Sequence, residues 1–284
     1  MDEMARLFDS PDFSGMLQQL GYENVEKAYI QYPERLQALA VWLNDASLET
    51  LKDALTTKLV MKAAPYLSEA FTQARFDLEY VLYGTYPVNL GGQAFDAVMN
   101  DMTDYVSQLY METYGNAETI ADVRALCEDI RDVFRARIEA IDWMSEETKA
   151  IALRKLEAIE FYIGGPDAAN AVSALDEAAI LTPEAGGSYF ANAMAIYKAE
   201  LAADAQRGTE SVDTEQFLWG ASGGAAEANC SYIPECNAVL LPMAMLQAPF
   251  YDPAATFEEN LGALGFVIAH EITHAFDSDG AHYD

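Results

Sequence analysis

The stretch His270-Glu271-Ile272-Thr273-His274 decides how the rest of this 284-residue sequence is interpreted. Side chains four positions apart on an α-helix lie on one face, about 6 Å apart along the axis, so both imidazoles can bind one metal ion. Two imidazoles and an adjacent carboxylate form the H-E-x-x-H pattern, in which the histidines hold Zn²⁺ and the glutamate takes a proton from zinc-activated water. The pattern predicts His270 and His274 as metal ligands and Glu271 as the catalytic general base.

The residues on both sides of the motif support this interpretation. Positions 260–269 start with Asn260, which can cap a helix, and continue as an apolar run. We therefore expect a buried zinc-binding helix. Asp277 follows His274 by three positions on the same face, so it could accept the second ring proton of this ligand. A solvent-exposed aspartate at the end of the helix is the open alternative.

Several other segments resemble landmarks of the neprilysin family of zinc endopeptidases, which includes neprilysin, endothelin-converting enzyme and bacterial oligopeptidase O. The resemblance spans most of the chain, and the segments occur in the family's order. Cys230 stands where the family usually has alanine. The segments are Ala64-Pro65-Tyr66-Leu67-Ser68-Glu69, Ile141-Asp142-Trp143-Met144, Ile163-Gly164-Gly165-Pro166-Asp167, Asn229-Cys230-Ser231-Tyr232, Leu241-Pro242 and Leu246-Gln247-Ala248-Pro249-Phe250.

The resemblance implies a zinc metalloendopeptidase that binds one zinc ion and cleaves oligopeptides. It implies that Asn229 and Cys230 lie on an edge strand and pair with the substrate main chain. It also implies a mainly α fold in two parts. Residues 1–186 would form a multi-helical, cavity-covering domain, and residues 187–284 would form the N-terminal part of an α+β zincin-like catalytic domain with a small sheet and a zinc-binding helix.

A third zinc ligand is missing from the pattern. In the family it is a glutamate on a later helix, followed four residues later by an aspartate and further on by an oxyanion-stabilising histidine, and this sequence has no counterpart of them. The metzincin pattern requires glycine at position 277 and histidine at position 280, where Asp277 and Gly280 stand. We therefore expect a middle portion of a longer enzyme, inactive by itself. A non-catalytic peptide-binding protein of the same fold and a helical module with an accidental motif are the alternatives.

The composition restricts the class of partner. The formal net charge of −30 disfavours nucleic acids and anionic membrane surfaces. No apolar run reaches 18 residues, so we expect no membrane segment. We expect a soluble bacterial protein and leave its compartment, cytoplasmic or secreted, open. Three cysteines exclude a dense disulfide framework, although a bridge between Cys230 and Cys236 is an open alternative.

Apolar periodicity and capping residues predict helices over most of the chain. Two short β-rich runs, 159–163 and 239–241, predict strands, with residues 229–232 beside the second. A domain boundary is expected near 183–187. The predicted helices cover 13–20, a helix opened by Pro33 and ending near Asn44, 48–63 capped by Ser47, a helix capped by Ser68 and closed by Gly84, 94–114, 120–141, a helix from Ser145 to about Ala158, and 189–205.

Overall fold

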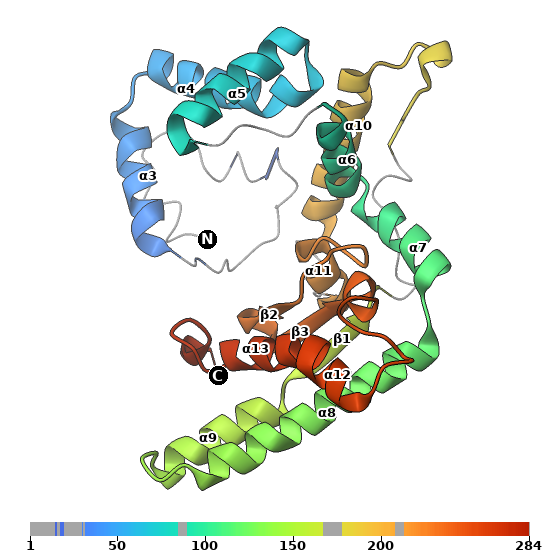
Figure 1. The fold of residues 1–284 in the computed structure, drawn as a ribbon. Coiled ribbons are helices and arrows are strands. Elements are labelled where there is room, and N and C mark those ends of the chain that lie inside the picture. The colour runs from blue at the N-terminus through green and yellow to red at the C-terminus, as the bar shows by residue number, and fades with distance from the viewer. Residues whose placement is uncertain are drawn as a thin grey trace. The chain divides into compact units, whose positions relative to one another are not determined.

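The computed structural model describes residues 32–84, 90–166, 178–207 and 213–283, together with Gly15, Gln18, Gln19 and Ile30. The helix predicted over 13–20 lies largely outside these residues. In the described part of the chain, most elements are helices, and there is one small three-stranded sheet (Figure 1). The predicted mainly α fold with a small sheet is confirmed.

The chain packs as two units, and each unit is built from two separate segments. The N-terminal unit comprises Met1–Asp96 and Ala174–Val212, and the sheet unit comprises Ala97–Ser173 and Asp213–Asp284. Helix α10 (Tyr189–Arg207), which the sequence places at the start of the catalytic portion, belongs to the N-terminal unit. The assignment of residues 1–186 and 187–284 to two functional domains stays a prediction.

Local capping chemistry sets the helix ends of the N-terminal unit. Ser47 accepts a hydrogen bond from the backbone N–H of Thr50, as predicted for an N-cap. Gly84 ends its helix with φ of 70°, a left-handed conformation that favours glycine. Ser68 occupies an N-cap position without a side-chain capping bond. The elements are α3 (Pro33–Asp45), α4 (Leu48–Ala63), η1 (Ala64–Tyr66), α5 (Glu69–Tyr83), the first half of α6 (Leu90–Asp101), η3 (Pro183–Ala185) and α10.

The single helix predicted over 94–114 is wrong. Two helices occupy this stretch, α6 and α7 (Thr103–Tyr114), with a break at Met102, whose φ is −132°. The hydroxyl of Thr103 donates to the carbonyl oxygen of Met99 at 2.7 Å, so a side chain competes for the carbonyls of the helix end. Apolar spacing continues through the break, so periodicity could not reveal it.

The sheet unit contains the three strands. Their order is β1-β3-β2, where β1 (Glu160–Gly164) runs parallel and β2 (Ser231–Ile233) antiparallel to the central strand β3 (Ala238–Pro242). The strands predicted over 159–163 and 239–241 are confirmed, and of the segment 229–232 predicted beside the second strand, residues 231 and 232 pair with it. Helix α11 (Thr214–Ala221) has no counterpart among the predicted elements.

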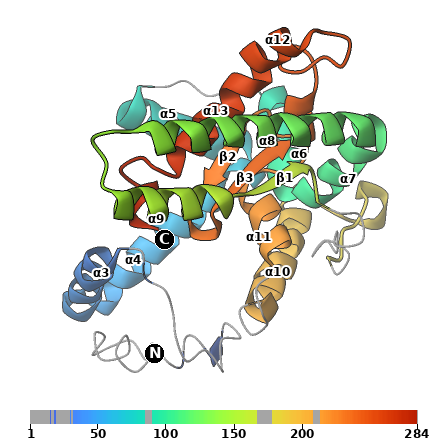
Figure 2. The same ribbon diagram turned by 90° about the horizontal axis from the view of Figure 1, so that it is seen from below.

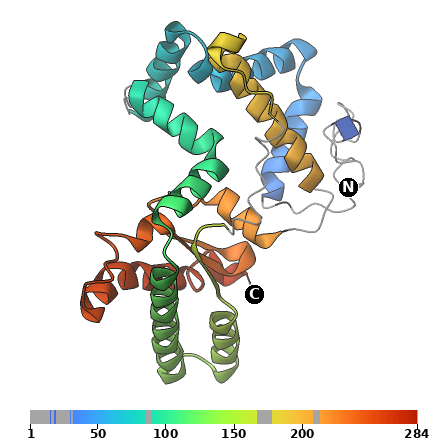
Figure 3. The ribbon, with the colours of Figure 1, turned by 90° about the vertical axis from the view of Figure 1, so that its right-hand side faces the viewer.

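Helices α8 (Ala117–Ala140) and α9 (Glu146–Glu157) form a hairpin that extends away from the sheet (Figure 3). Asn116 caps α8 by accepting from the backbone N–H groups of Glu118 and Thr119, so this helix starts three residues before the predicted position. Ser145 caps α9 as predicted, through the N–H of Thr148. Figure 2 shows the hairpin crossing one side of the sheet, with α13 (Phe266–His274) beyond it.

Alternate residues of β3 belong to different hydrophobic clusters, which follows from the two-residue period of a strand. Val239 and Leu241 join the cluster that contains Val123 of α8 and Ile272 of α13. Leu240 instead packs with Leu218 and Trp219 of α11. All five residues of β3 are buried, as is typical of a central strand covered on both faces. This packing positions α13 against the sheet.

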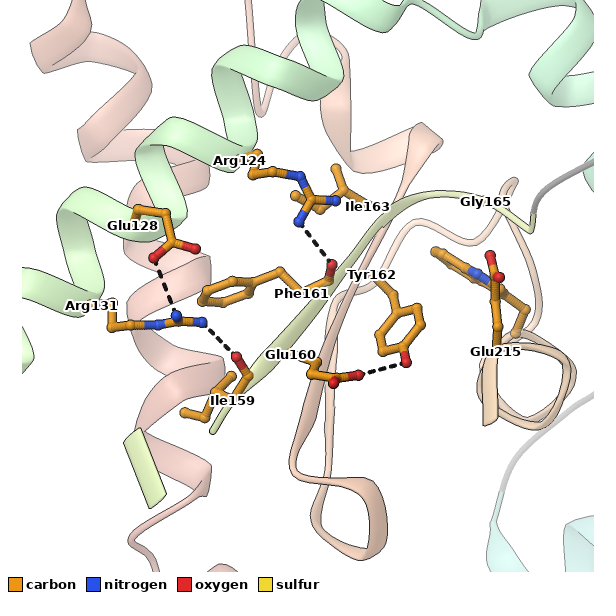
Figure 4. Close-up of a pocket in the computed structure, with 11 residues that line it drawn as sticks. Arg124, Glu128, Arg131, Ile159, Glu160, Phe161, Tyr162, Ile163, Gly165 and Glu215 are labelled. Atoms are coloured by element: carbon orange, nitrogen blue, oxygen red, sulfur yellow. Dashed lines mark hydrogen bonds and ion pairs between the residues drawn. The ribbon is translucent and has the colours of Figure 1, made fainter. Parts of the chain in front are cut away.

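The outer edge of β1 is covered by arginines of α8 (Figure 4). Arg124 donates to the carbonyl oxygen of Phe161 at 3.3 Å, and Arg131 donates to that of Ile159 at 2.5 Å. These side chains line a cavity of about 470 Å³ beside the strand. Charged side chains on an edge strand oppose pairing with another chain. The opposite edge of the sheet, β2, borders the H-E-x-x-H helix.

Candidate active site

The helix that carries the motif begins earlier than predicted. Its cap is Thr256, whose hydroxyl accepts from the N–H of Glu259 while the Glu259 carboxylate accepts from the N–H of Thr256, a capping box. Asn260, the predicted cap, lies inside the helix and bonds to the N–H and carbonyl of Asp252. The helix runs through α12 (Phe257–Asn260), a π-helical turn, η6 (Leu261–Gly265), and α13.

Burial of this helix is one-sided. Leu264, Ile268 and Ile272 are fully buried, whereas Phe266 is 70% exposed. The prediction of a buried helix therefore holds for one face only. The π-helical turn places the N–H of Leu264 within 3.0 Å of the carbonyl oxygen of Phe250, a bond that ties the preceding loop to the helix.

The two histidines of the motif face each other. Their Nε2 atoms are 3.1 Å apart, and the rings meet edge to face at an interplanar angle of 86°. A tetrahedral zinc ion with Zn–N distances of about 2.0–2.1 Å separates two ligand nitrogens by about 3.3 Å. The pair therefore fits two ligand positions of one zinc ion. Within the described ranges, no group of three or more His, Cys, Asp or Glu side chains could hold a metal ion.

Asp277 orients His274 from outside the pair. Its Oδ2 atom lies 2.7 Å from His274 Nδ1, and its Oδ1 atom accepts from the N–H groups of Asp279 at 2.9 Å and Gly280 at 2.8 Å. The hydrogen bond to His274 is the main cause that lowers the pKa of Asp277, to about 2. The carboxylate is therefore ionised near neutral pH and accepts from Nδ1, which leaves Nε2 as the ring nitrogen that could bind a metal.

Glu271 lies at the base of the site and is only 6% exposed. Burial raises the pKa of this carboxyl, while the two histidines and a hydrogen bond from the backbone N–H of Tyr232 oppose the rise. The side chain lines the cavity between β2 and the zinc helix, together with both histidines.

Asn229 and Cys230 immediately precede β2, the edge strand, instead of lying within it. Asn229 is exposed. Cys230 is 3% exposed, and burial, followed by the charge of Glu271, raises the pKa of its thiol to about 12. Cys127, Cys230 and Cys236 are all free thiols, so the alternative of a bridge between Cys230 and Cys236 is absent from the structure.

All six predicted site residues line one cavity of about 390 Å³ between β2 and the zinc helix. The sequence reasoning missed the site roles of Tyr232, which holds Glu271, and of Gly280, where an added Cβ would lie 1.9 Å from the carbonyl oxygen of His274. Neither role has a signal in local sequence spacing. The lining residues are Asn229, Cys230, Ser231, Tyr232, Pro234, His270, Glu271, His274, Asp277, Asp279 and Gly280.

A helix bearing H-E-x-x-H that packs on a small sheet, with an edge strand beside the motif, defines the class of zincin-like peptidases. The sequence matches the models of peptidase family M13 over residues 1–166 and 229–284. The chain belongs to this family, and the resemblance to neprilysin-like enzymes is confirmed.

The chain spans less than half the length of the curated relatives it matches. It is 32% identical to mouse membrane metallo-endopeptidase-like 1, covering 90% of this chain and 33% of the relative. It is 29% identical to the neutral endopeptidase of Lactobacillus helveticus, covering 100% of this chain and 43% of the relative. For human neprilysin the identity is 28%, with 92% of this chain and 34% of the relative covered.

Solved structures share the fold. The zinc metalloprotease ZMP1 of Mycobacterium tuberculosis, in complex with an inhibitor, superposes with a TM-score of 0.81 at 23% identity, covering 100% of this chain and 42% of that chain. PEPO from Lactobacillus rhamnosis gives a TM-score of 0.67 at 28% identity, covering 90% and 39%. Among the described residues, no helix has the length and apolar character needed to cross a bilayer.

Proposed function

We propose that this chain carries part of the active site of a zinc metalloendopeptidase that cleaves oligopeptides. The observation that carries the proposal is the paired Nε2 atoms of His270 and His274, 3.1 Å apart, above the buried Glu271 carboxylate. Membership of family M13, with endopeptidases among its relatives, supports it. His270 and His274 would hold the zinc ion.

When bound, zinc supplies a Lewis acid that polarises the scissile carbonyl and lowers the pKa of water. Glu271 serves as the general base that accepts the proton of the attacking water and passes it to the leaving amine. Burial raises the pKa of this carboxyl and so lowers the free-energy cost of its protonated form. The side chain can therefore both accept the proton from water and hold it until the transfer to the amine. The N–H of Tyr232 keeps the carboxylate beside the reacting atoms.

The sheet edge at β2 binds the substrate main chain in this proposal. An extended peptide can add to an edge strand through backbone hydrogen bonds. Such bonds do not depend on the side chains of the peptide, so oligopeptides of different sequence can bind in the same way. Asn229 stands exposed at the start of this edge, and its amide can both donate and accept. The arginines that cover the outer edge of β1 disfavour strand addition there.

The 284-residue chain by itself is inactive in this proposal, because it provides two zinc ligands where catalytic sites use three from protein. The third ligand would come from a part of the enzyme that this sequence does not contain.

The test uses the longer protein that contains this sequence and a fluorogenic oligopeptide. We expect hydrolysis that a chelator abolishes and added Zn²⁺ restores, with about one zinc per molecule. Two results contradict the proposal. One is hydrolysis that survives complete removal of zinc. The other is peptide binding without turnover by the zinc-loaded protein, which would identify a peptide-binding protein of this fold.

A further inference from the structure

Lys155, near the end of α9, reaches the turn that follows the zinc helix. Its ammonium group donates to the carbonyl oxygen of Gly280 at 2.5 Å and also to that of Tyr283. Gly280 begins the short 3₁₀ helix η7 (Gly280–His282), and Lys155 lies 125 positions before it in the sequence. The cation thus adds a charged donor to two carbonyls of this turn, and the Gly280 carbonyl also accepts from the N–H of Tyr283 at 3.0 Å.

The same lysine is tied to the other side of the site through its backbone. Its carbonyl oxygen accepts from the Asn237 side chain at 3.0 Å, and the Asn237 oxygen accepts from the Tyr232 hydroxyl at 2.9 Å. Tyr232 is the residue whose backbone holds Glu271. Lys155 therefore connects β2 and the turn after the zinc helix, which both contribute residues to the cavity.

The turn that Lys155 holds also fixes Asp277. Backbone N–H groups of Asp279 and Gly280 bind one carboxylate oxygen of Asp277, and the other oxygen binds His274 Nδ1. Gly280 is packed too closely against the carbonyl of His274 for any Cβ. The contacts form one series, from the Lys155 ammonium through the turn and Asp277 to His274.

We propose that Lys155 is a positioning residue of the metal site: it fixes the 279–283 turn so that Asp277 holds the His274 ring in the orientation that binds zinc. The inference deepens the proposed function and rests on it. Outer partners of metal-ligating histidines contribute about 10- to 100-fold to metal affinity. Lys155 acts on the histidine through Asp277, so its contribution lies at the lower end of that range.

The first test measures Zn²⁺ affinity of the 284-residue chain by competition with a fluorescent zinc indicator. Lys155→Met removes the ammonium group and should weaken affinity about tenfold. Arg154→Met is the matched control, because Arg154 is the exposed neighbour on the same helix and also loses one positive charge. It should change affinity less than about twofold, and Lys155→Arg, which keeps donors for both carbonyls, should recover most of the loss.

A double-mutant cycle separates positioning from general structural support. If Lys155 acts through Asp277, Lys155→Met should add less than about twofold in an Asp277→Asn background. The same tenfold factor in both backgrounds would overturn the proposal. Parent-like affinity in a folded Lys155→Met protein would also overturn it. Should Lys155→Met fail to fold, Lys155→Gln, which keeps one donor, takes its place with the same thresholds.

A metal-free measurement makes this test independent of the proposed function. In the zinc-free chain, proton–nitrogen NMR spectra should show a protected His274 Nδ1 proton in the parent and in Arg154→Met, and a rapidly exchanging one in Lys155→Met. Protection that persists without Lys155 contradicts the positioning role whether or not the chain binds zinc. Protection that depends on Lys155, with no zinc bound by any variant, would instead count against the metal site alone.

Discussion

His274 is held on both sides of its imidazole ring. Asp277 binds Nδ1 at 2.7 Å, and His270 lies 3.1 Å from Nε2. Because the ionised carboxylate requires a donor, Nδ1 carries a proton, and Nε2 is the ring nitrogen that faces the other histidine. The carboxylate thus orients the ring with Nε2 in the position proposed for zinc binding. A metal ion would find the ligand already oriented.

Asn229 contributes to substrate binding in this account, and it lines the same cavity as the histidine pair. In the longer enzyme, Asn229→Ala should lower kcat/KM about 10- to 100-fold, the cost of about one or two hydrogen bonds to the substrate main chain. Zinc content should stay unchanged. Peptide hydrolysis and elemental analysis of the same preparation check both expectations.

Cys230→Ala is the neighbouring control. The thiol is buried, and any pairing with substrate at this position uses the backbone, so kcat/KM should stay within about threefold of the parent. A large loss in Cys230→Ala, together with a mild one in Asn229→Ala, would reverse the roles assigned to these two positions.

At this scale, the sequence predicted the residues whose chemistry depends on local spacing. His270, Glu271, His274 and Asp277 lie within one helix and the turn after it, so a helical period was enough to place them together. Lys155 could not be found in this way. It reaches the site from a distant helix, and only the packing of the sheet unit reveals the contact.

Among the elements, helix starts were predictable where a single residue could act as a cap. Ser47 and Ser145 cap the helices expected of them. The start of the zinc helix was misplaced because two residues could cap it, and Asn260 lies one turn after Thr256. The capping box formed by Thr256 and Glu259 was the signal that distinguishes them.

The capping contacts make a prediction that concerns one unit of the chain. Ser47→Ala should reduce the free energy of unfolding of the N-terminal unit by about 1 kcal/mol, because the N–H of Thr50 loses its acceptor. Ser68→Ala should cost only a few tenths of a kcal/mol, since Ser68 makes no side-chain capping bond. Urea denaturation checks the difference, and equal losses would contradict it.

The whole molecule is assembled from segments that are far apart in the sequence. In the N-terminal unit, Tyr189 of α10 packs on Tyr66 with ring centroids 5.2 Å apart, and Lys62 lies 4.0 Å from the ring centre of Tyr197. The boundary predicted near 183–187 divides the chain at one point, so it cannot describe units that are each built from two separate segments. These long-range contacts depend on surface shape, which has no periodic sequence signal.

At the level of the whole chain, we expect the isolated 284-residue protein to carry little zinc after purification and to leave oligopeptides intact. If the proposed function holds, its zinc affinity should be at least about tenfold weaker than that of a longer protein that supplies a third ligand. Zinc titration and a peptidase assay on a verified sample check this. Chelator-sensitive hydrolysis by the isolated chain would show that Asp277, Asp279, His282 or a neighbouring molecule supplies the third ligand.

The most direct measurement compares the longer enzyme with its Glu271→Gln variant in one experiment that records bound zinc and oligopeptide turnover. Glutamine keeps the size of the side chain and leaves both histidines in place, but it cannot accept the proton. We expect about one zinc ion per molecule in both proteins and a kcat lower by about three orders of magnitude or more in the variant. Turnover within tenfold of the parent, with zinc still bound, would contradict the account.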